Sequence, residues 1–257
     1  MRRRNSRIRT KLPTTEIEYQ YAHGTNVYGS EIRDDGMGIF SANLSDSGKI
    51  RGHITTSPFY YESLVWDGKV GINGQTTTPL SLKIRQTDGK RIFYGSDATK
   101  KIHQVDLTTA WDSSTVDSGT WVQMANTGLS SPHGIEFSHD GMILFVAGST
   151  MAWKKYVLTN PYDLSSFTVP TNIYTPTRYI DGFCFYKQGF SMIEVSRDNN
   201  NVIFKKLATA YEPTSVIETT TVVETVNCRD ISATEDGSYV LYQRLASSRL
   251  VKNNIYL

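Results

Sequence analysis

A hairpin turn recurs five times along this chain of 257 residues. The segments "RDDGMGIF", "QTDGKRIF", "SHDGMILF", "YKQGFSMI" and "TEDGSYVL" each place a glycine between two runs that favour β-strands. These glycines lie 48 to 53 residues apart, at Gly36, Gly89, Gly141, Gly189 and Gly237. Five copies at nearly one period indicate a repeat architecture. In the Asp-Gly copies we expect two-residue type I′ turns, with a positive φ at both residues.

An aromatic residue follows each of the first four turn glycines by 21 to 23 residues, and an acidic residue comes shortly after it. These aromatics are Phe59, Trp111, Tyr162 and Tyr211. A third strand is expected between the two markers and a fourth after the aromatic, because these stretches alternate and are rich in Thr, Val, Ile and Tyr. Four strands in a unit of about 50 residues are typical of a β-propeller blade.

The sequence therefore predicts an all-β chain: a five-bladed β-propeller of four-stranded antiparallel blades over residues 14–257, with a basic N-terminal arm at residues 1–13. The fifth unit contains three strand-like stretches, whereas "TTEIEYQYAHG" before the first unit reads as one more strand. We expect residues 15–21 to form the outer strand of the last blade, so that an N-terminal strand closes the ring.

The arm is the main charge asymmetry of the chain. Residues 1–13 contain no acid, and their basic residues are Arg2, Arg3, Arg4, Arg7, Arg9 and Lys11. The rest of the chain holds 21 basic and 25 acidic side chains, a net charge of −4, which argues against a nucleic-acid-binding body. We expect the arm to dock into an acidic groove of a partner protein; a solvated tail is the alternative.

Apolar stretches and cysteines in the sequence indicate which cellular compartments suit this chain. No apolar stretch follows the charged start, so the sequence predicts neither a secretory signal peptide nor a membrane span. The two cysteines, Cys184 and Cys228, are expected to be buried thiols rather than a disulfide.

The third unit, "GIEFSHDGMILFVAGSTMAWKKYVLTNPYDLSSFT", resembles the propeller repeat common in tail and other virion proteins of bacteriophages. In those repeats a "DG…(L/M)(F/Y)V" hairpin is followed by a "Y-x-L-(S/T)-x-P-(W/Y/F)-D-(L/I)-S" strand end. Units two and four match less well, and units one and five only in outline. Similar hairpins occur in sugar-lactone hydrolases and in proteins with NHL-type repeats, because fold does not fix function.

The resemblance implies a non-enzymatic structural or adsorption protein of a tailed-bacteriophage virion. Its expected place is the tail, a fibre or spike, or the capsid surface as a decoration, after synthesis in the host cytoplasm. The arm would attach it to other virion proteins, and a host-surface glycan is a possible ligand.

Candidate ligand-binding residues come from the repeat register, because propellers bind ligands at the mouth of the channel where the inner strands begin. Counting eight residues back from each turn glycine gives Tyr28, Ser81, His133, Asp181 and Arg229. We expect these side chains to gather at one channel mouth as a structural or weak binding ring, with Asp181 paired to Arg229.

Two other functions stay open. The repeated aromatics suit a carbohydrate-binding lectin, although packing between blades is the expected role of such rings. A lactonase-like hydrolase would need more carboxylates than the ring supplies, since calcium takes about six or more oxygen ligands and glycoside hydrolysis uses a pair of acids. Glu31, Glu136 and Asp230 are the acids nearest in sequence. We expect no catalytic residue, no metal and no cofactor.

Overall fold

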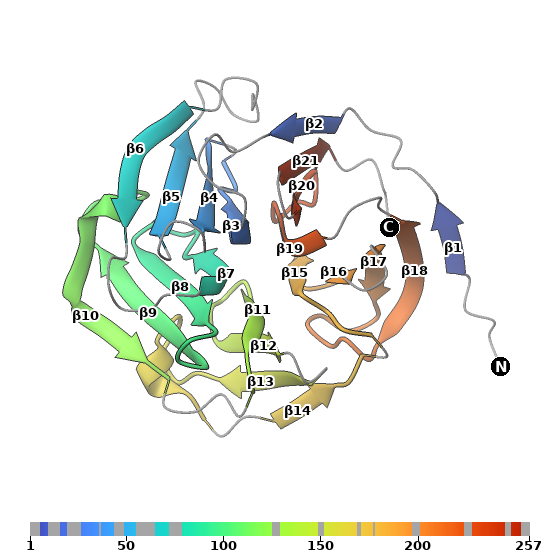
Figure 1. The fold of residues 1–257 in the computed structure, drawn as a ribbon. Helices are drawn as coiled ribbons and strands as arrows, with labels where there is room; N and C mark the ends of the chain where they lie inside the picture. The colour runs from blue at the N-terminus through green and yellow to red at the C-terminus, as the bar shows by residue number, and fades with distance from the viewer. Residues whose placement is uncertain are drawn as a thin grey trace.

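The computed structural model describes residues 6–9, 16–19, 27–35, 37–43, 49–54, 65–71, 79–124, 129–148, 152–168, 171–176, 178–196, 201–223, 228–244 and 248–252. Their strands form five sheets, which are arranged around a common centre in Figure 1. We call these sheets blades one to five, in chain order. In the part of the chain that is described, no helix is long and apolar enough to cross a membrane.

The first three blades each contain four consecutive antiparallel strands. Blade one consists of β3 (Val27–Ile32), β4 (Gly38–Asn43), β5 (Lys49–Ile54) and β6 (Val65–Gly71). Blade two consists of β7 (Pro79–Ile84), β8 (Arg91–Ser96), β9 (Lys101–Leu107) and β10 (Val116–Gln123). Blade three consists of β11 (Pro132–Phe137), β12 (Ile143–Gly148), β13 (Trp153–Val157) and β14 (Thr171–Tyr174). The short 3-10 helices η2 (Ser113–Thr115) and η3 (Leu164–Ser166) precede the last strands of blades two and three.

Blades four and five both include a strand from the N-terminal segment. Blade four consists of β15 (Gly182–Tyr186), β16 (Ser191–Ser196), β17 (Asn201–Leu207), β18 (Val216–Val223) and β1 (Ser6–Arg9). Blade five consists of β19 (Cys228–Ala233), β20 (Tyr239–Arg244), β21 (Ser248–Lys252) and β2 (Glu16–Tyr19).

The two N-terminal strands bear on separate predictions. Strand β2 lies within the predicted range 15–21 and pairs antiparallel with β21, from Glu16↔Val251 to Tyr19↔Ser248. Strand β1 departs from the prediction, because it adds a fifth strand to blade four and runs parallel to β18. The backbones of Arg7 and Arg9 thus belong to a sheet, whereas Arg2, Arg3, Arg4 and Lys11 lie outside the described residues.

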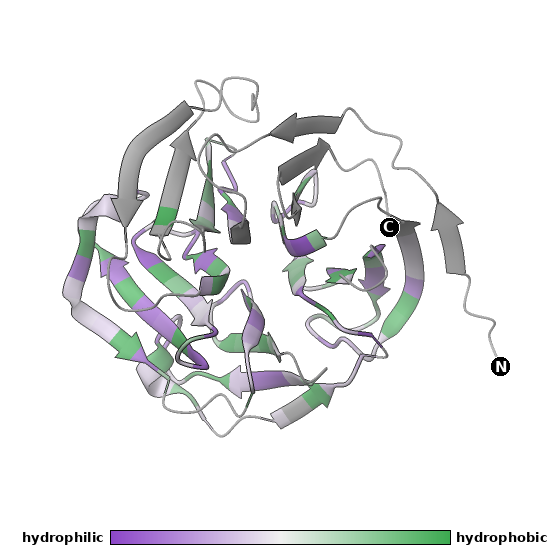
Figure 2. Cartoon of the chain, viewed as in Figure 1, coloured by the Kyte–Doolittle hydropathy of each residue, from purple (hydrophilic) through white to green (hydrophobic). Residues whose placement is uncertain are grey.

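The innermost strands make successive contacts around the centre: β3 with β7, β7 with β11, β11 with β15, β15 with β19 and β19 with β3. Four clusters of buried side chains lie between neighbouring blades, and apolar residues recur along the strands in Figure 2. Cys184 and Cys228 are free, buried thiols in the cluster between blades four and five, as expected. A chain that places its apolar side chains on both faces of each sheet buries them only when a neighbouring sheet covers each face.

The Asp-Gly turns between the first two strands of blades two, three and five are not of type I′. Gly89, Gly141 and Gly237 have φ values of 66°, 71° and 72°, but the aspartate before each is outside the left-handed region. Instead, the aspartate side chain accepts a hydrogen bond from the backbone N–H two residues on, as Asp140 Oδ1 does from Met142 at 3.0 Å. The same bond joins Asp88 to Lys90 and Asp236 to Ser238. An aspartate that closes the turn with its side chain leaves only the glycine needing a positive φ.

The repeated aromatics lie on the turn glycines of their own units. The backbone N–H of Tyr162 donates to the carbonyl of Gly141 at 2.9 Å, and a Cβ on that glycine would lie 2.1 Å from the tyrosine ring. Trp111 on Gly89 and Tyr211 on Gly189 repeat the arrangement. Each ring also contacts a phenylalanine of the preceding blade; the pairs are Trp111–Phe40, Tyr162–Phe93 and Tyr211–Phe145. The aromatics therefore pack between blades, as expected; Phe59 lies outside the described residues.

The acidic residue after the aromatic caps the turn that follows. Asp163 Oδ1 accepts a hydrogen bond from the Ser165 backbone N–H at 2.9 Å at the start of η3, and Asp112 does the same for Ser114 at 3.1 Å before η2. Such a carboxylate satisfies a backbone N–H that has no partner within the helix. These two acids of the repeat motif thus have a structural role.

Replacing Gly141 with Ala is expected to lower the free energy of unfolding by about 2 kcal/mol or more, because the positive φ and the Tyr162 ring both oppose a Cβ. The matched control is Gly119→Ala in β10, where a Cβ would meet only Asp117 Oδ1 at 3.2 Å; it should change stability by about 0.5 kcal/mol or less. Urea titrations of both variants measure the difference. Equal losses in the two variants would contradict the role given to the aromatic ring.

Candidate functional site

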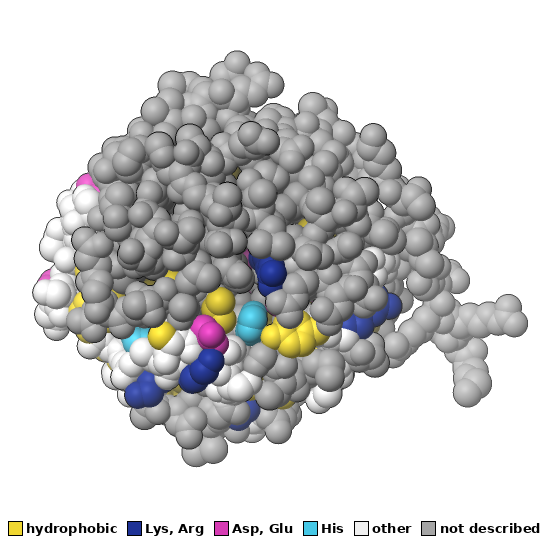
Figure 3. Space-filling model, viewed as in Figure 1, with side chains coloured by type: hydrophobic (Ala, Val, Ile, Leu, Met, Phe, Trp, Pro, Cys, Tyr) yellow, Lys and Arg dark blue, Asp and Glu magenta, His cyan; other side chains and the backbone are white. Residues whose placement is uncertain are grey.

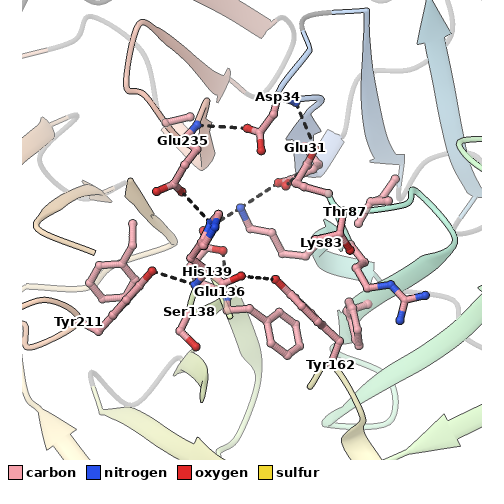
Figure 4. A pocket seen from close by; sticks show the side chains of 17 residues that line it. Glu31, Asp34, Lys83, Thr87, Glu136, Ser138, His139, Tyr162, Tyr211 and Glu235 are labelled. Carbon is pink, nitrogen blue, oxygen red and sulfur yellow. Dashed lines mark hydrogen bonds and ion pairs between the residues drawn. The ribbon is translucent and has the colours of Figure 1, made fainter. Parts of the chain in front are cut away.

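A cavity of about 290 Å³ lies where the innermost strands lead into their turns, and it is lined by residues from all five blades. Its walls combine four carboxylates with the rings of Phe93, Phe137, Phe185, Tyr162 and Tyr211. The carboxylates belong to Glu31, Asp34, Glu136 and Glu235, and Lys83 reaches in among them in Figure 4. Residues at the ends of all five innermost strands line this cavity, which makes it a candidate site.

Lys83 joins three neighbouring blades through buried ion pairs. Its Nζ lies 2.8 Å from Glu31 Oε2 of blade one and 2.8 Å from Glu136 Oε2 of blade three. Gln86 also donates from Nε2 to Glu31 Oε1 at 2.8 Å. All three charged side chains are nearly inaccessible to solvent, so each depends on the others for compensation of its charge.

Burial shifts the protonation of this trio. Loss of solvation raises the pKa of Glu31 from an ordinary value of 4.5 to about 7, and it also raises the pKa of Glu136. Burial opposes the charge of Lys83, but the carboxylates of Glu136 and Glu31 outweigh this and hold its pKa well above the ordinary value. One ammonium between two carboxylates compensates one negative charge and leaves a second, which favours a proton on Glu31 near neutral pH.

In the trio the Lys83 ammonium lies between the two acids. Both carboxylates contact one ammonium nitrogen, so the contacting oxygen atoms are no further apart than twice 2.8 Å. Retaining glycosidases hold two carboxyl groups about 5–5.5 Å apart, with the scissile bond between them. Here the Lys83 ammonium contacts both acids and compensates their charge.

The rim of the cavity is built from the turns, which are linked to one another. The Glu235 N–H of blade five donates to Asp34 Oδ1 of blade one at 3.1 Å, and the Asp34 N–H donates to Gln86 Oε1 of blade two at 3.1 Å. In blade four the Gln188 N–H donates to Glu235 Oε1 at 2.5 Å. Partial burial raises the pKa values of Asp34 and Glu235. The rim carboxylates therefore act as acceptors that join successive turns.

The two tyrosines of the cavity use their hydroxyl groups to hold the blade-three turn. Tyr162 Oη donates to the His139 carbonyl at 2.9 Å, and Tyr211 Oη accepts from the His139 N–H at 2.8 Å. The His139 ring lies at the rim, with Nδ1 4.0 Å from Glu235 Oε2. Because ring and hydroxyl are both engaged, each tyrosine is part of the wall.

The sequence-predicted ring falls at the opposite ends of the innermost strands. In β3, β7, β11 and β19 the register shifts after the first pair, and the residue at each shift is Tyr28, Leu80, His133 or Arg229. Asp181 directly precedes β15. Four predicted positions are thus structurally equivalent, but Ser81 is one residue too far along. Of Tyr28 only the backbone is described.

The error at Ser81 has a local cause. The turn at Gly89 contains one more residue than the others: its N–H bonds to Arg85 O four residues back, whereas Gly141 bonds to Ser138 three residues back. Counting a fixed eight residues therefore overshoots in blade two. Ser81 itself is buried, and its Oγ accepts from the Gly95 N–H at 3.1 Å and donates to the Pro132 carbonyl at 3.5 Å.

The structure brings two predicted ring residues together. His133 Nδ1 lies 3.4 Å from Asp181 Oδ1, and its Nε2 lies 3.1 Å from the hydroxyl of Tyr179. Asp181 is buried, and the His133 side chain is 14% exposed. His133 is thus one neighbour of the Asp181 carboxylate, and the pairing of Asp181 with Arg229 stays a prediction. Figure 3 shows one face of the molecule, on which a histidine and charged side chains of both signs reach the surface close together.

Sequence reasoning named Glu31 and Glu136 only as acids near the ring and did not identify Lys83. A signal for the trio is present, because Glu31 and Glu136 lie five residues before their turn glycines and Lys83 lies six before its own. A lysine inside the mostly apolar strand "PLSLKI" is a further signal, because lysine is rarely buried. Counting five residues back from each turn glycine finds Glu31 and Glu136, and the extra residue in the Gly89 turn moves Lys83 to six residues before its glycine.

Among the described residues, no group of three or more His, Cys, Asp or Glu side chains is placed to hold a metal ion. The fold and the site define the chain as a β-propeller in which the polar groups around the centre connect the blades. No protein-family model matches the sequence, and no curated protein sequence matches it either.

Similarity to solved structures is confined to the fold. Many solved chains share this architecture. One is a chain in the crystal structure of a nidogen/laminin complex, with a TM-score of 0.57 and 12% sequence identity. The match covers 85% of this chain and 72% of the other. At this identity the likeness supports a β-propeller and says nothing about the ligand.

We expect Glu31→Gln to flatten the pH dependence of stability between pH 5 and pH 8. The native protein holds the Glu31 proton up to about pH 7, whereas the unfolded chain releases it near 4.5. The contribution of this group is thus complete below the unfolded pKa and is lost as the pH rises through the native one. In the Glu31→Gln variant this titrating group is absent, so the fall in the free energy of unfolding between pH 5 and pH 8 should be smaller by on the order of 1–3 kcal/mol.

Urea titrations across this pH range test the expectation, with Glu212→Gln in a surface turn of blade four as the matched control. The control should keep the wild-type slope. A Glu31→Gln variant whose stability falls with pH as steeply as the wild type would show that Glu31 does not carry the proton.

Proposed function

We propose that this chain is a non-enzymatic structural or adsorption protein of a tailed-bacteriophage virion, in the tail, a fibre or spike, or decorating the capsid. The observation that carries the proposal is the use of the repeat motif itself. Its glycine, aromatic and acid close turns and join blades, as a mounting scaffold requires. The resemblance of the third unit to virion propeller repeats supports the setting, and the basic arm provides an attachment element.

We further propose that the five sheets are the blades of a closed ring and that β2 is the closing strand. Support comes from buried contacts between blades five and one. The Ser30 N–H donates to Asp230 Oδ2 at 2.7 Å, and the Ile32 N–H donates to Ser232 Oγ at 3.0 Å. A ring closed within one blade by strands from distant parts of the chain ties those parts together.

Deletion of residues 14–24 tests the closing strand. The deletion removes β2 and leaves the edge of β21 without its partner, so we expect aggregation or unfolding of the variant. Size-exclusion chromatography and a thermal melt measure both outcomes. A monomeric variant with wild-type stability would rule out a closing role for β2.

A lectin is the second candidate, because sugar binding also suits an adsorption protein. The position of the described repeat aromatics weighs against stacking of a sugar on them, because each ring rests on a turn glycine. A lectin site would then have to use other aromatics. A glycan array separates this candidate from the first.

A hydrolase is the third candidate. The Glu31–Lys83–Glu136 arrangement weighs against it, because the ammonium lies between the two acids. The other polar group of interest is the Asp181–His133 pair at the opposite mouth. A lactonase activity that disappears in a fully folded Asp181→Asn variant would overturn the non-enzymatic assignment.

The virion assignment is tested on particles. Antibodies raised against the purified chain should label intact virions, and mass spectrometry of purified particles should detect the chain. Absence of the chain from both measurements would remove the virion setting and promote the lectin candidate.

A further inference from the structure

We propose that the outer edge of β18 is a strand-docking site, and that β1 of a second copy of this chain occupies it when copies associate. This inference rests on the part of the proposed function that makes the arm an attachment element, and it names the partner. The groups involved are backbone N–H and C=O groups at a sheet edge, which pair with any extended segment in register.

Strand β1 is an addition to a blade that is already complete. Strands β15 to β18 form a four-stranded antiparallel unit like those of blades one to three. Among the sheets described, blade four alone has a fifth strand, and this strand is parallel to its neighbour. Because β1 completes no repeat unit, its release leaves the four strands of blade four paired with one another.

The attachment of β1 is small relative to the edge that receives it. The register joins four residues, from Ser6↔Thr219 to Arg9↔Val222, whereas β18 spans Val216–Val223. Ile217, which precedes the paired stretch, is 55% exposed. Parallel pairing is also slightly weaker per residue than antiparallel pairing. A four-residue parallel strand at an edge is therefore held weakly enough to exchange.

The position of β1 permits exchange between copies. Residues 10–15 separate β1 in blade four from β2 in blade five, and six residues span at most about 20 Å. Figure 1 shows β1 on the outside of the ring, beyond β18. A second copy that approaches this rim can accept β1 without any change in the innermost strands.

Charge favours contact between an arm and another body. Residues 1–13 carry six basic side chains and no acid, while residues 14–257 have a net charge of −4. Bodies therefore repel each other, and an arm is attracted to a body of either copy. An exchanged β1 forms the same backbone pairs that it forms within one chain, so the exchange costs little free energy. A high local concentration of copies favours it further.

Disulfide trapping between separately purified variants tests the proposal. Ile8 and Thr221 are register partners, and adjacent strands lie about 4.8 Å apart, which is within the Cα separation that a disulfide bridges. Ile8→Cys and Thr221→Cys are mixed at high concentration and oxidised, and mass spectrometry identifies the crosslinked peptides. The matched control replaces Thr221→Cys with Thr214→Cys, an exposed position before β18.

We expect the crosslink between residues 8 and 221 of the two chains to be at least about tenfold more abundant than the crosslink between residues 8 and 214. Equal yields would indicate random oxidation and overturn the proposal. The double variant Ile8→Cys/Thr221→Cys is the positive control, because its disulfide can form within one chain. If this disulfide forms but the mixture of single variants gives no crosslink, the proposal is also overturned. The experiment uses no virus, so its failure leaves the virion assignment standing, and absence of the chain from particles leaves the trapping result standing.

Discussion

The fold depends on the burial of sheets that are apolar on both faces. Strands β7 and β16 are buried along their whole length, which requires a neighbouring sheet on each side. The apolar clusters lie accordingly between successive blades. The outermost strands do not share this requirement, and β10 is exposed or half-buried throughout. Successive contacts between inner strands follow from the same need, because each inner strand must be covered by two others.

The repeat motif meets this requirement at the turns. A glycine with a positive φ lets the aromatic ring of the same unit lie directly on the backbone, and that ring then reaches a phenylalanine of the preceding blade. One aromatic thus closes a turn and joins two sheets. Since the motif exists for packing, it identifies the architecture and leaves the ligand open.

The sequence was sufficient to predict those features of the fold that depend on the local spacing of residues. Turn glycines and aromatics predicted the strand-turn units, and the stretch around Glu16–Tyr19 was placed in the last sheet, where it lies. The type I′ turns were wrong because an aspartate side chain replaces the second positive φ. Ser81 is not equivalent to the other four predicted ring positions, because one extra residue before Gly89 shifts the count. The pairing of β1 with β18 could not be read from spacing, since any extended segment can add to a sheet edge.

The Lys83 trio was not predicted for a different reason. Its role is to specify the order and register in which the blades pack, and this role involves several repeat units. Desolvation offsets much of the attraction in a buried ion pair, so the trio adds little net stability, whereas loss of one partner leaves an uncompensated charge. Five similar units can in principle pack in several orders or registers, and apolar contacts discriminate poorly among them. A lysine in blade two that needs a carboxylate from each of blades one and three disfavours every arrangement that separates these blades or slides one along another. Such a constraint involves three units at once, so the spacing within a repeat gives the position of each residue but not the pairing between them.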